Sequence, residues 1–134
     1  MAMLQRFELT SKVVILTGAA GLFGRQIAFA LAEAGATLVL ASRNQSDLAR
    51  LADERPGLPI CCATLDQGKE DSILALRDGV LQKFGRVDGL VNNAVLRPMK
   101  SLSDPVSAWE ESMRVNATGL FLMSRAFGEA MRQQ

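Results

Sequence analysis

The segment from Thr17 to Gly24 reads TGAAGLFG, and its glycine spacing is typical of a loop that binds a diphosphate. It follows an apolar, β-branched run and opens a segment with helical periodicity, which is the context that such a loop requires. We expect Gly18 to form the tight turn, Gly21 to let a phosphate approach the backbone N–H groups, and Gly24 to let the helix pack on the sheet. A plain strand-to-helix turn is the alternative. The residues predicted to bind the ligand here are Gly18, Ala20, Gly21, Leu22, Phe23 and Gly24.

Ser42, Arg43 and Asn44 follow the second apolar run, at the point where a dinucleotide-binding domain distinguishes its two common cofactors. An acidic residue there holds the ribose 2′-hydroxyl of NAD, whereas an arginine accommodates the 2′-phosphate of NADP. None of the three residues is acidic, Arg43 offers a planar set of donors, and Ser42 adds a hydroxyl. The pattern favours NADP(H), with NAD(H) as the second option, and disfavours an S-adenosylmethionine site. The alternative is that Arg43 is only a surface residue.

Two residue types that carry much enzyme chemistry are absent, because the 134 residues include no histidine and no tyrosine. Histidine-dependent triads, dyads and zinc sites are therefore excluded. Cys61 and Cys62 are adjacent rather than spaced as metal ligands, so no metal site is predicted. We interpret them as small residues inside a buried strand of a protein from a reducing compartment. Any catalysis by this chain has to use Ser, Thr, Lys, Asn or carboxylates.

Charge and hydropathy argue against two classes of partner. Fifteen basic and 14 acidic residues give a net charge of +1 without a run of like charge, so nucleic-acid binding is not expected. No apolar stretch reaches the roughly 18 residues of a membrane span, and the first residues lack the layout of a secretion signal. We therefore expect a cytoplasmic protein that binds small molecules.

Short apolar runs alternate with helix-period segments along the whole chain, which predicts one α/β domain over residues 1–134. Strands this continuously apolar need helices on both faces, as in a parallel sheet. We predict a Rossmann-type three-layer, doubly wound sheet with strand order 3-2-1-4, whose ligand lies at the carboxyl ends of the strands. The predicted strands are 12–16, 37–41, 59–65 and 87–94. The first predicted helix covers 23–34, the second begins after Asn44 as its N-cap, the third covers 71–84, and the fourth runs from Pro105 to the end.

Three further motifs, together with the glycine turn, give the chain a resemblance to the short-chain dehydrogenase/reductase family over nearly its whole length. They are Thr64-Leu65-Asp66, Asn92-Asn93-Ala94-Val95, and the segment Arg114–Gly119 that contains Asn116. The resemblance implies that Asp66 binds the adenine amino group, with the backbone of Leu65 alongside. It also implies that Asn92, Asn93, Ala94 and Val95 line the adenosine ribose and the path to the nicotinamide. Asn116 would be a catalytic residue, holding a water of the proton relay through a locally opened helix.

The chain departs from the family pattern at three points. The glycine turn is TGxxGxxG where the family commonly has TGxxxGxG, and Val95 replaces the glycine of the NNAG motif. The family's serine and its Tyr-x-x-x-Lys motif are missing, since the sequence ends at Gln134 and has no tyrosine. We expect a fragment or a shortened gene product that lacks the C-terminal strands, exposes the edge of the fourth strand, and forms a homo-oligomer.

Three functions remain open from the sequence. The first is an NADP(H)-dependent oxidoreductase that transfers a hydride between the cofactor and an alcohol or carbonyl substrate, with this chain as an inactive cofactor-binding part. The second is a non-catalytic dinucleotide-binding or interaction module. The third is a different Rossmann enzyme, such as a methyltransferase.

Overall fold

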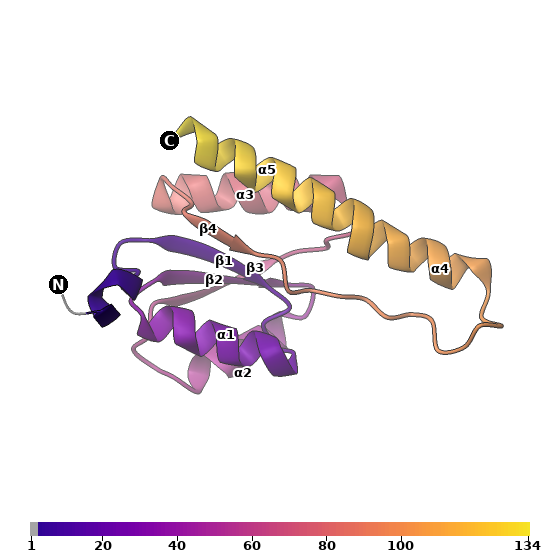
Figure 1. Ribbon diagram of the computed structural model, residues 1–134, viewed down its shortest axis with the longest axis horizontal. Helices are drawn as coiled ribbons and strands as arrows, with labels where there is room; N and C mark the ends of the chain where they lie inside the picture. Colours follow the sequence, from indigo (N-terminus) through magenta and orange to yellow (C-terminus); the bar gives the residue numbers. More distant parts are fainter. Residues whose placement is uncertain (1–2) are drawn as a thin grey trace.

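Four short apolar segments form one parallel sheet in the computed structural model, which describes residues 3–134. Their order is β3-β2-β1-β4, so the predicted order 3-2-1-4 and the α/β Rossmann-like fold are confirmed. Figure 1 shows the strands with their carboxyl ends toward the same edge of the sheet. The strands are β1 (Val13–Thr17), β2 (Thr37–Ser42), β3 (Ile60–Thr64) and β4 (Gly89–Val91).

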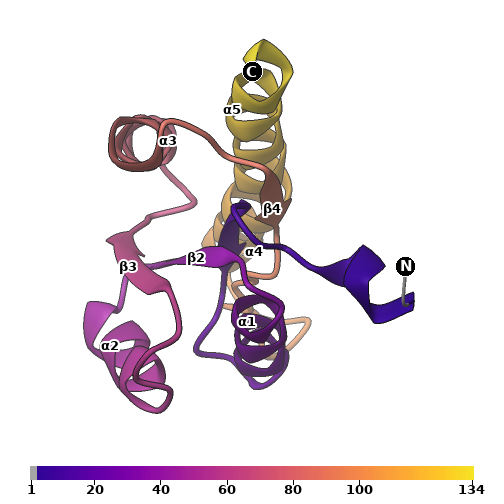
Figure 2. The same ribbon diagram turned by 90° about the vertical axis from the view of Figure 1, so that its left-hand side faces the viewer.

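Helices cover both faces of this sheet, as strands buried on two sides require. Figure 2 shows α1 and α2 on one face and α3 and α5 on the other. A 3-10 turn, η1, precedes β1, and a π-helical segment, η2, joins α4 to α5. The helical elements are η1 (Met3–Phe7), α1 (Leu22–Glu33), α2 (Gln45–Asp53), α3 (Glu70–Phe84), α4 (Val106–Met113), η2 (Arg114–Gly119) and α5 (Leu120–Gln133).

The core consists of two apolar layers separated by the sheet. Alternate residues of β1 point to opposite faces, so Ile15 packs toward α3 and α5 while Leu16 packs toward α1 and α2. Both side chains are fully buried, and all five residues of β1 are buried. The two central strands therefore hold the carboxyl-end loops in fixed positions.

The outer strands differ from the prediction. Cys61 is half-buried and Cys62 is exposed, so the interpretation of both as residues of a buried strand is wrong. The reason is that β3 is an edge strand, in which Cys61 faces α3 and Cys62 faces the opposite side, and neither face is fully covered. At the other edge, β4 ends at Val91 rather than at residue 94, because the backbone N–H of Asn93 donates to the Thr17 hydroxyl, 3.1 Å away, and leaves the ladder.

The last fifth of the chain is one long helical rod, α4–η2–α5 (Figure 1). The buried side chains of α5 are Met123, Ala126, Phe127 and Ala130, which pack on the sheet and α3. The apolar side chains that the sequence places near one face of this rod are exposed, namely Trp109, Met113, Leu120 and Phe121. No helix formed by residues 3–134 is both long and apolar enough to cross a membrane.

Candidate cofactor-binding site

The turn after β1 exposes backbone N–H groups at the start of α1. Gly18 has a φ of +68°, which is the left-handed conformation that favours glycine, and the Gly21 N–H donates to its carbonyl at 3.2 Å. The first helical bond from this turn is Arg25 N–H to Gly21 C=O at 3.0 Å. The amides between them have no helical acceptor, and Gly21 provides no side-chain cap. They are free to bind an anion.

The three glycines of the turn meet different surroundings. A Cβ on Gly24 would lie 2.1 Å from the Gly18 carbonyl oxygen, and one on Gly18 would lie 2.8 Å from the Ala94 Cα. The packing of the protein itself therefore requires glycine at both positions. A Cβ on Gly21 would meet only the Gly18 carbonyl, at 3.4 Å, so no protein contact requires glycine there. Open space at Gly21 fits the approach of a ligand phosphate.

Thr17 and Asn93 hold this turn against the end of β4. The buried Thr17 hydroxyl accepts hydrogen bonds from the N–H groups of Asn93 and Ala94, at 3.1 and 2.9 Å. The Asn93 side-chain amide donates to the carbonyls of Thr17 and Gly18, at 3.2 and 3.0 Å. Asn93 therefore shapes the site by positioning the backbone. Thr17 was not among the predicted site residues, although a hydroxyl residue directly before the first glycine was the available signal.

At the end of β2, the side chains range from the hydrogen-bonded Ser42 and Asn44 to the exposed Arg43. The Ser42 hydroxyl accepts from the Asn44 N–H at 3.2 Å, and Asn44 caps α2 by accepting from the Asp47 N–H at 3.3 Å. Arg43 is exposed, and within residues 3–134 its guanidinium makes no hydrogen bond or ion pair. The guanidinium is available to bind a ligand phosphate.

Asp66 lies in the loop after β3, where hydrogen bonds of its backbone N–H and of its carboxylate orient it. Its N–H donates to the Ser72 hydroxyl at 2.8 Å, and one carboxylate oxygen accepts from the Gly68 N–H at 3.0 Å. Lys69 pairs with the other oxygen at 3.5 Å. Next to it, Gln67 is 7% exposed and its side-chain carbonyl oxygen has no hydrogen-bond partner within the described part of the chain.

Two cavities meet at the carboxyl edge of the sheet, and both are lined by Gly18 and Val95. One, of about 180 Å³, is bounded by the ends of β2 and β3 and by the loop after β4. The other, of about 430 Å³, lies against the glycine turn. The first is lined by Gly18, Ala41, Ser42, Arg43, Leu65, Asp66, Gln67, Ala94, Val95, Leu96 and Val115. The second is lined by Gly18, Gly21, Leu22, Phe23, Gly24, Asn93, Val95 and Arg97.

This pair of cavities fits a dinucleotide. The smaller one offers Arg43, Asp66 and the unpaired oxygen of Gln67, which are partners for a phosphate and for a base amino group. Leu22, Phe23 and Gly24, whose amides are free, line the larger cavity, which joins the smaller one at Gly18, and this arrangement suits a diphosphate bridge. Gln67, Leu96 and Arg97 line the cavities although the motifs did not include them, because their positions depend on loop packing, and Val115 lines the smaller cavity from within the Arg114–Gly119 motif.

Asn116 lies in η2 and lines neither cavity, although the adjacent Val115 lines the smaller one, and its catalytic role stays a prediction. Its side-chain amide donates to the Leu96 carbonyl at 2.6 Å, and its carbonyl oxygen accepts from the Leu96 N–H at 2.8 Å. A π-helical segment, in which the helix is locally wider, is often found at functional sites. Asn116 therefore positions the loop after β4, from which Leu96 reaches the smaller cavity.

Three other predicted residues also lie outside the two cavities. Ala20 lines a separate surface depression near Arg25, and Asn44 serves as the cap of α2. Asn92 donates to the Ser124 hydroxyl at 3.2 Å, and its carbonyl oxygen is buried without a partner in residues 3–134. A cofactor-binding role for these residues stays a prediction.

The chain belongs to the short chain dehydrogenase family, because a sequence model of that family matches residues 12–134. The D-threitol dehydrogenase of Mycolicibacterium smegmatis is 35% identical over 133 residues, which cover 93% of this chain and 49% of that protein. A metagenomic short-chain oxidoreductase in complex with NADP is 32% identical, with a TM-score of 0.85 over 91% of this chain and 57% of its own.

A 7α-hydroxysteroid dehydrogenase complexed with NADH and 7-oxo glycochenodeoxycholic acid is 29% identical. Its TM-score is 0.90, over 99% of this chain and 53% of its own. This chain therefore spans about half the length of the relatives it matches. One of the two similar structures holds NADP and the other NADH, so the cofactor of this chain has to be argued from its own residues.

Proposed function

We propose that this chain is the dinucleotide-binding part of an NADP(H)-dependent oxidoreductase acting on an alcohol or carbonyl substrate. The observation that carries the cofactor preference is the unpaired guanidinium of Arg43 at the wall of the smaller cavity, in a segment without an acid. A charge-assisted bond to the 2′-phosphate adds about 1.5–3 kcal/mol. The NADP-bound relative is consistent with this preference, and the NADH-bound one keeps NAD(H) as the alternative.

The residues divide the binding of the cofactor among them. The amides from Leu22 to Gly24 would hold the diphosphate, Asp66 the adenine amino group, and Arg43 with Ser42 the 2′-phosphate. The cofactor supplies the hydride. Asn116 keeps the loop after β4 in place through its two bonds to Leu96.

Isothermal titration calorimetry with NADPH and NADH tests the cofactor preference. We expect NADPH to bind roughly ten- to hundredfold more tightly, which corresponds to the added bonds to the 2′-phosphate. Equal affinities, or tighter binding of NADH, would contradict the proposal. The absence of binding by either dinucleotide would remove the dinucleotide function altogether.

We also propose that these 134 residues alone do not turn over a substrate, since they include no tyrosine to act as the acid. General acid catalysis contributes about 10²–10⁴-fold to a rate. Steady consumption of NADPH with a panel of aldehydes and ketones, measured at 340 nm, would show that another group supplies the proton.

The second candidate function is a non-catalytic interaction module, and it is favoured by the exposed apolar side chains along the α4–η2–α5 rod. A homo-oligomer through this rod is part of the proposal, as is a cytoplasmic location based on the two free cysteines. Analytical ultracentrifugation tests the association, and a monomer at all concentrations would contradict it.

A further inference from the structure

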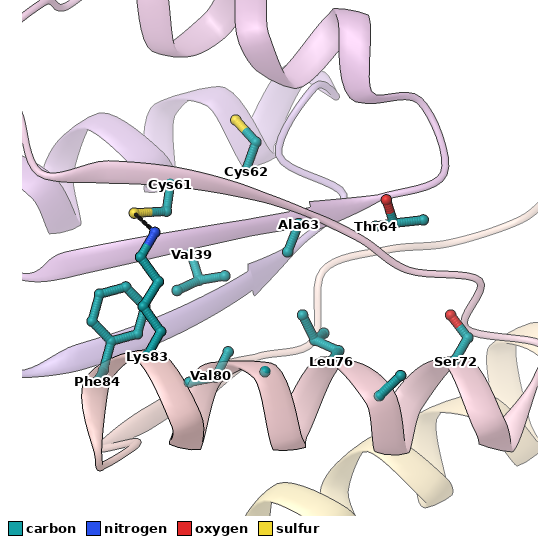
Figure 3. A pocket seen from close by; sticks show the side chains of 12 residues that line it. Val39, Cys61, Cys62, Ala63, Thr64, Ser72, Leu76, Val80, Lys83 and Phe84 are labelled. Carbon is teal, nitrogen blue, oxygen red and sulfur yellow. Dashed lines mark hydrogen bonds between the residues drawn. The ribbon is translucent and has the colours of Figure 1, made fainter.

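A third cavity, of about 410 Å³, lies between the edge strand β3 and helix α3 (Figure 3). None of its lining residues lines either of the two cofactor cavities. Helix α3 lies over the β3 side of the sheet (Figure 2), and the cavity is the part of the space between them that side chains do not fill. Its volume lies in the range of small-molecule sites.

The walls of this cavity are mainly apolar. Val39 forms part of the sheet side, and Leu76 and Val80 project from α3; all three side chains are buried. Ala63 and Phe84 complete the apolar surface (Figure 3). Such walls select a ligand with an aliphatic body.

Gly79 keeps the cavity open. It lies inside α3, where glycine lowers helix stability relative to alanine. A Cβ at this position would meet nothing within 4 Å, so neither packing nor a positive φ requires glycine here. A larger side chain would enter the cavity that Gly79 lines.

One charged side chain, that of Lys83, lines the cavity between β3 and α3. The Lys83 ammonium lies 3.5 Å from the Cys61 sulfur and 5.3 Å from the centre of the Phe84 ring. Within residues 3–134 it makes no ion pair with a carboxylate. Figure 3 shows Lys83 and Cys61 meeting at one end, while Thr64 and Ser72 lie toward the other. The site therefore combines an apolar body with a cation at one end.

We propose that this cavity binds an aliphatic carboxylate, with the carboxylate on the Lys83 ammonium and the chain between β3 and α3. A neutral aliphatic ligand would leave the ammonium without its ion pair, and a phosphate alone would leave the apolar walls unfilled. The ligand and the dinucleotide occupy different cavities, so the two are expected to bind together.

The test uses decanoate as the probe and Cys61 as the reporter. In the variant Cys62→Ser, Cys61 is the single remaining thiol. Decanoate is expected to slow its alkylation by iodoacetamide in a saturable way and to be seen by calorimetry. Decanol is expected to protect about tenfold less well, because it lacks the charge that pairs with Lys83. Equal protection by decanol and decanoate would overturn the carboxylate assignment.

Two pairs of variants locate the site. Lys83→Gln is expected to weaken decanoate binding about tenfold, whereas Lys100→Gln, in the loop between β4 and α4, leaves it unchanged. Gly79→Leu fills the cavity and is expected to abolish binding, whereas Gly128→Leu, at an equally open glycine of α5, leaves it unchanged. Circular dichroism tests whether each variant is folded.

Three results would overturn the proposal. The first is decanoate binding that is the same in Lys83→Gln and Gly79→Leu as in the parent chain. The second is the absence of any binding by the parent chain while NADPH still binds. The third is protection of Cys61 that rises with protein concentration alone, which would make a second copy of the chain the occupant.

Discussion

The turn after β1 and the end of β2 line the same edge of the sheet, yet they hold their residues in opposite ways. In the turn, a Cβ on Gly24 would lie 2.1 Å from a backbone oxygen, and Asn93 donates to two carbonyls of the turn. At the end of β2, the exposed Arg43 contacts no partner among the described residues. One region is a packed backbone, and the other is a free side chain.

This difference teaches how one fold can serve two cofactors. The diphosphate is common to NAD and NADP, so the groups that bind it can be backbone amides held by the core. The 2′-phosphate is the group that differs, and it meets a side chain whose replacement leaves the core unchanged. Substitutions in the turn should therefore change the stability of the fold, and substitutions at the end of β2 should change cofactor choice alone.

The largest effect is expected for Gly24→Ala. The added methyl group overlaps the Gly18 carbonyl oxygen and approaches the Ala19 Cα to 2.8 Å, so the turn has to move. We expect a loss of about 3 kcal/mol in the free energy of unfolding, measured by urea denaturation. Gly128→Ala is the matched control, because its Cβ meets nothing within 4 Å and alanine favours the helix. Equal stability of the two variants would show that the turn is not packed as described.

Arg43→Asp is expected to reverse the cofactor preference. The carboxylate repels a 2′-phosphate and accepts a bond from a 2′-hydroxyl, so the ratio of NADPH to NADH affinity should fall about a hundredfold. The urea midpoint should not change, because the side chain is exposed. Arg6→Asp, in the exposed turn η1, is the control for a general charge effect. An unchanged ratio in Arg43→Asp would show that Arg43 does not contact the phosphate.

Asn93→Ala, compared with Asn92→Ala, distinguishes the contributions of the two neighbouring asparagines to stability. It removes the donor to the carbonyls of Thr17 and Gly18, and we expect a loss of about 2 kcal/mol in the free energy of unfolding. Asn92→Ala removes one bond to the Ser124 hydroxyl on the surface and should cost about 0.5 kcal/mol or less. Thermal or urea unfolding of both variants measures the difference, and equal losses would contradict the role assigned to Asn93.

The smallest effect is expected at the opposite end of the same strands, where Asp88 accepts from the Val13 N–H at 2.8 Å. The Arg86 guanidinium beside it holds the pKa of Asp88 below its usual value, although partial burial opposes this. The carboxylate therefore stabilises the fold above about pH 4, and this contribution is lost as the pH falls through the lower folded pKa. We expect the carboxylate to contribute about 1 kcal/mol to the free energy of unfolding. In urea titrations from pH 6 to pH 3, the free energy of unfolding should fall less in Asp88→Asn than in the parent chain. Parallel falls in the two proteins would contradict this role of Asp88.

Much of the fold followed from residue patterns. The apolar runs and the punctuating glycines predicted four parallel strands and their order, and Asn44 was identified correctly as the cap of α2. The predictions failed at the edges of the sheet, where the residue pattern of a strand does not determine how much of the strand is buried. Cys62 was expected to be buried, but it is exposed on the face of β3 opposite α3, where burial depends on how far α2 extends over an edge strand.

The rod at the end of the chain shows a second limit. Trp109 and Leu120 lie near one face at α-helical spacing and both are exposed. Spacing groups side chains on a face without showing whether that face packs on another element. The exposure of these side chains was therefore not readable from spacing. Likewise, Gln67 became part of the site only because its side-chain amide donates to the Val115 carbonyl at 3.1 Å, across 48 residues of chain.

The sequence by itself determined the alternation of strands and helices and the glycine turn, since periodicity and the conformational freedom of glycine are local properties of the chain. It also predicted the strand order, because right-handed crossovers leave few topologies for such an alternation. The tertiary structure alone decided the two adjoining cavities, the positioning role of Asn93 and the opening beside β3. The reason is that these features depend on distances between segments far apart in the sequence, and only packing sets those distances.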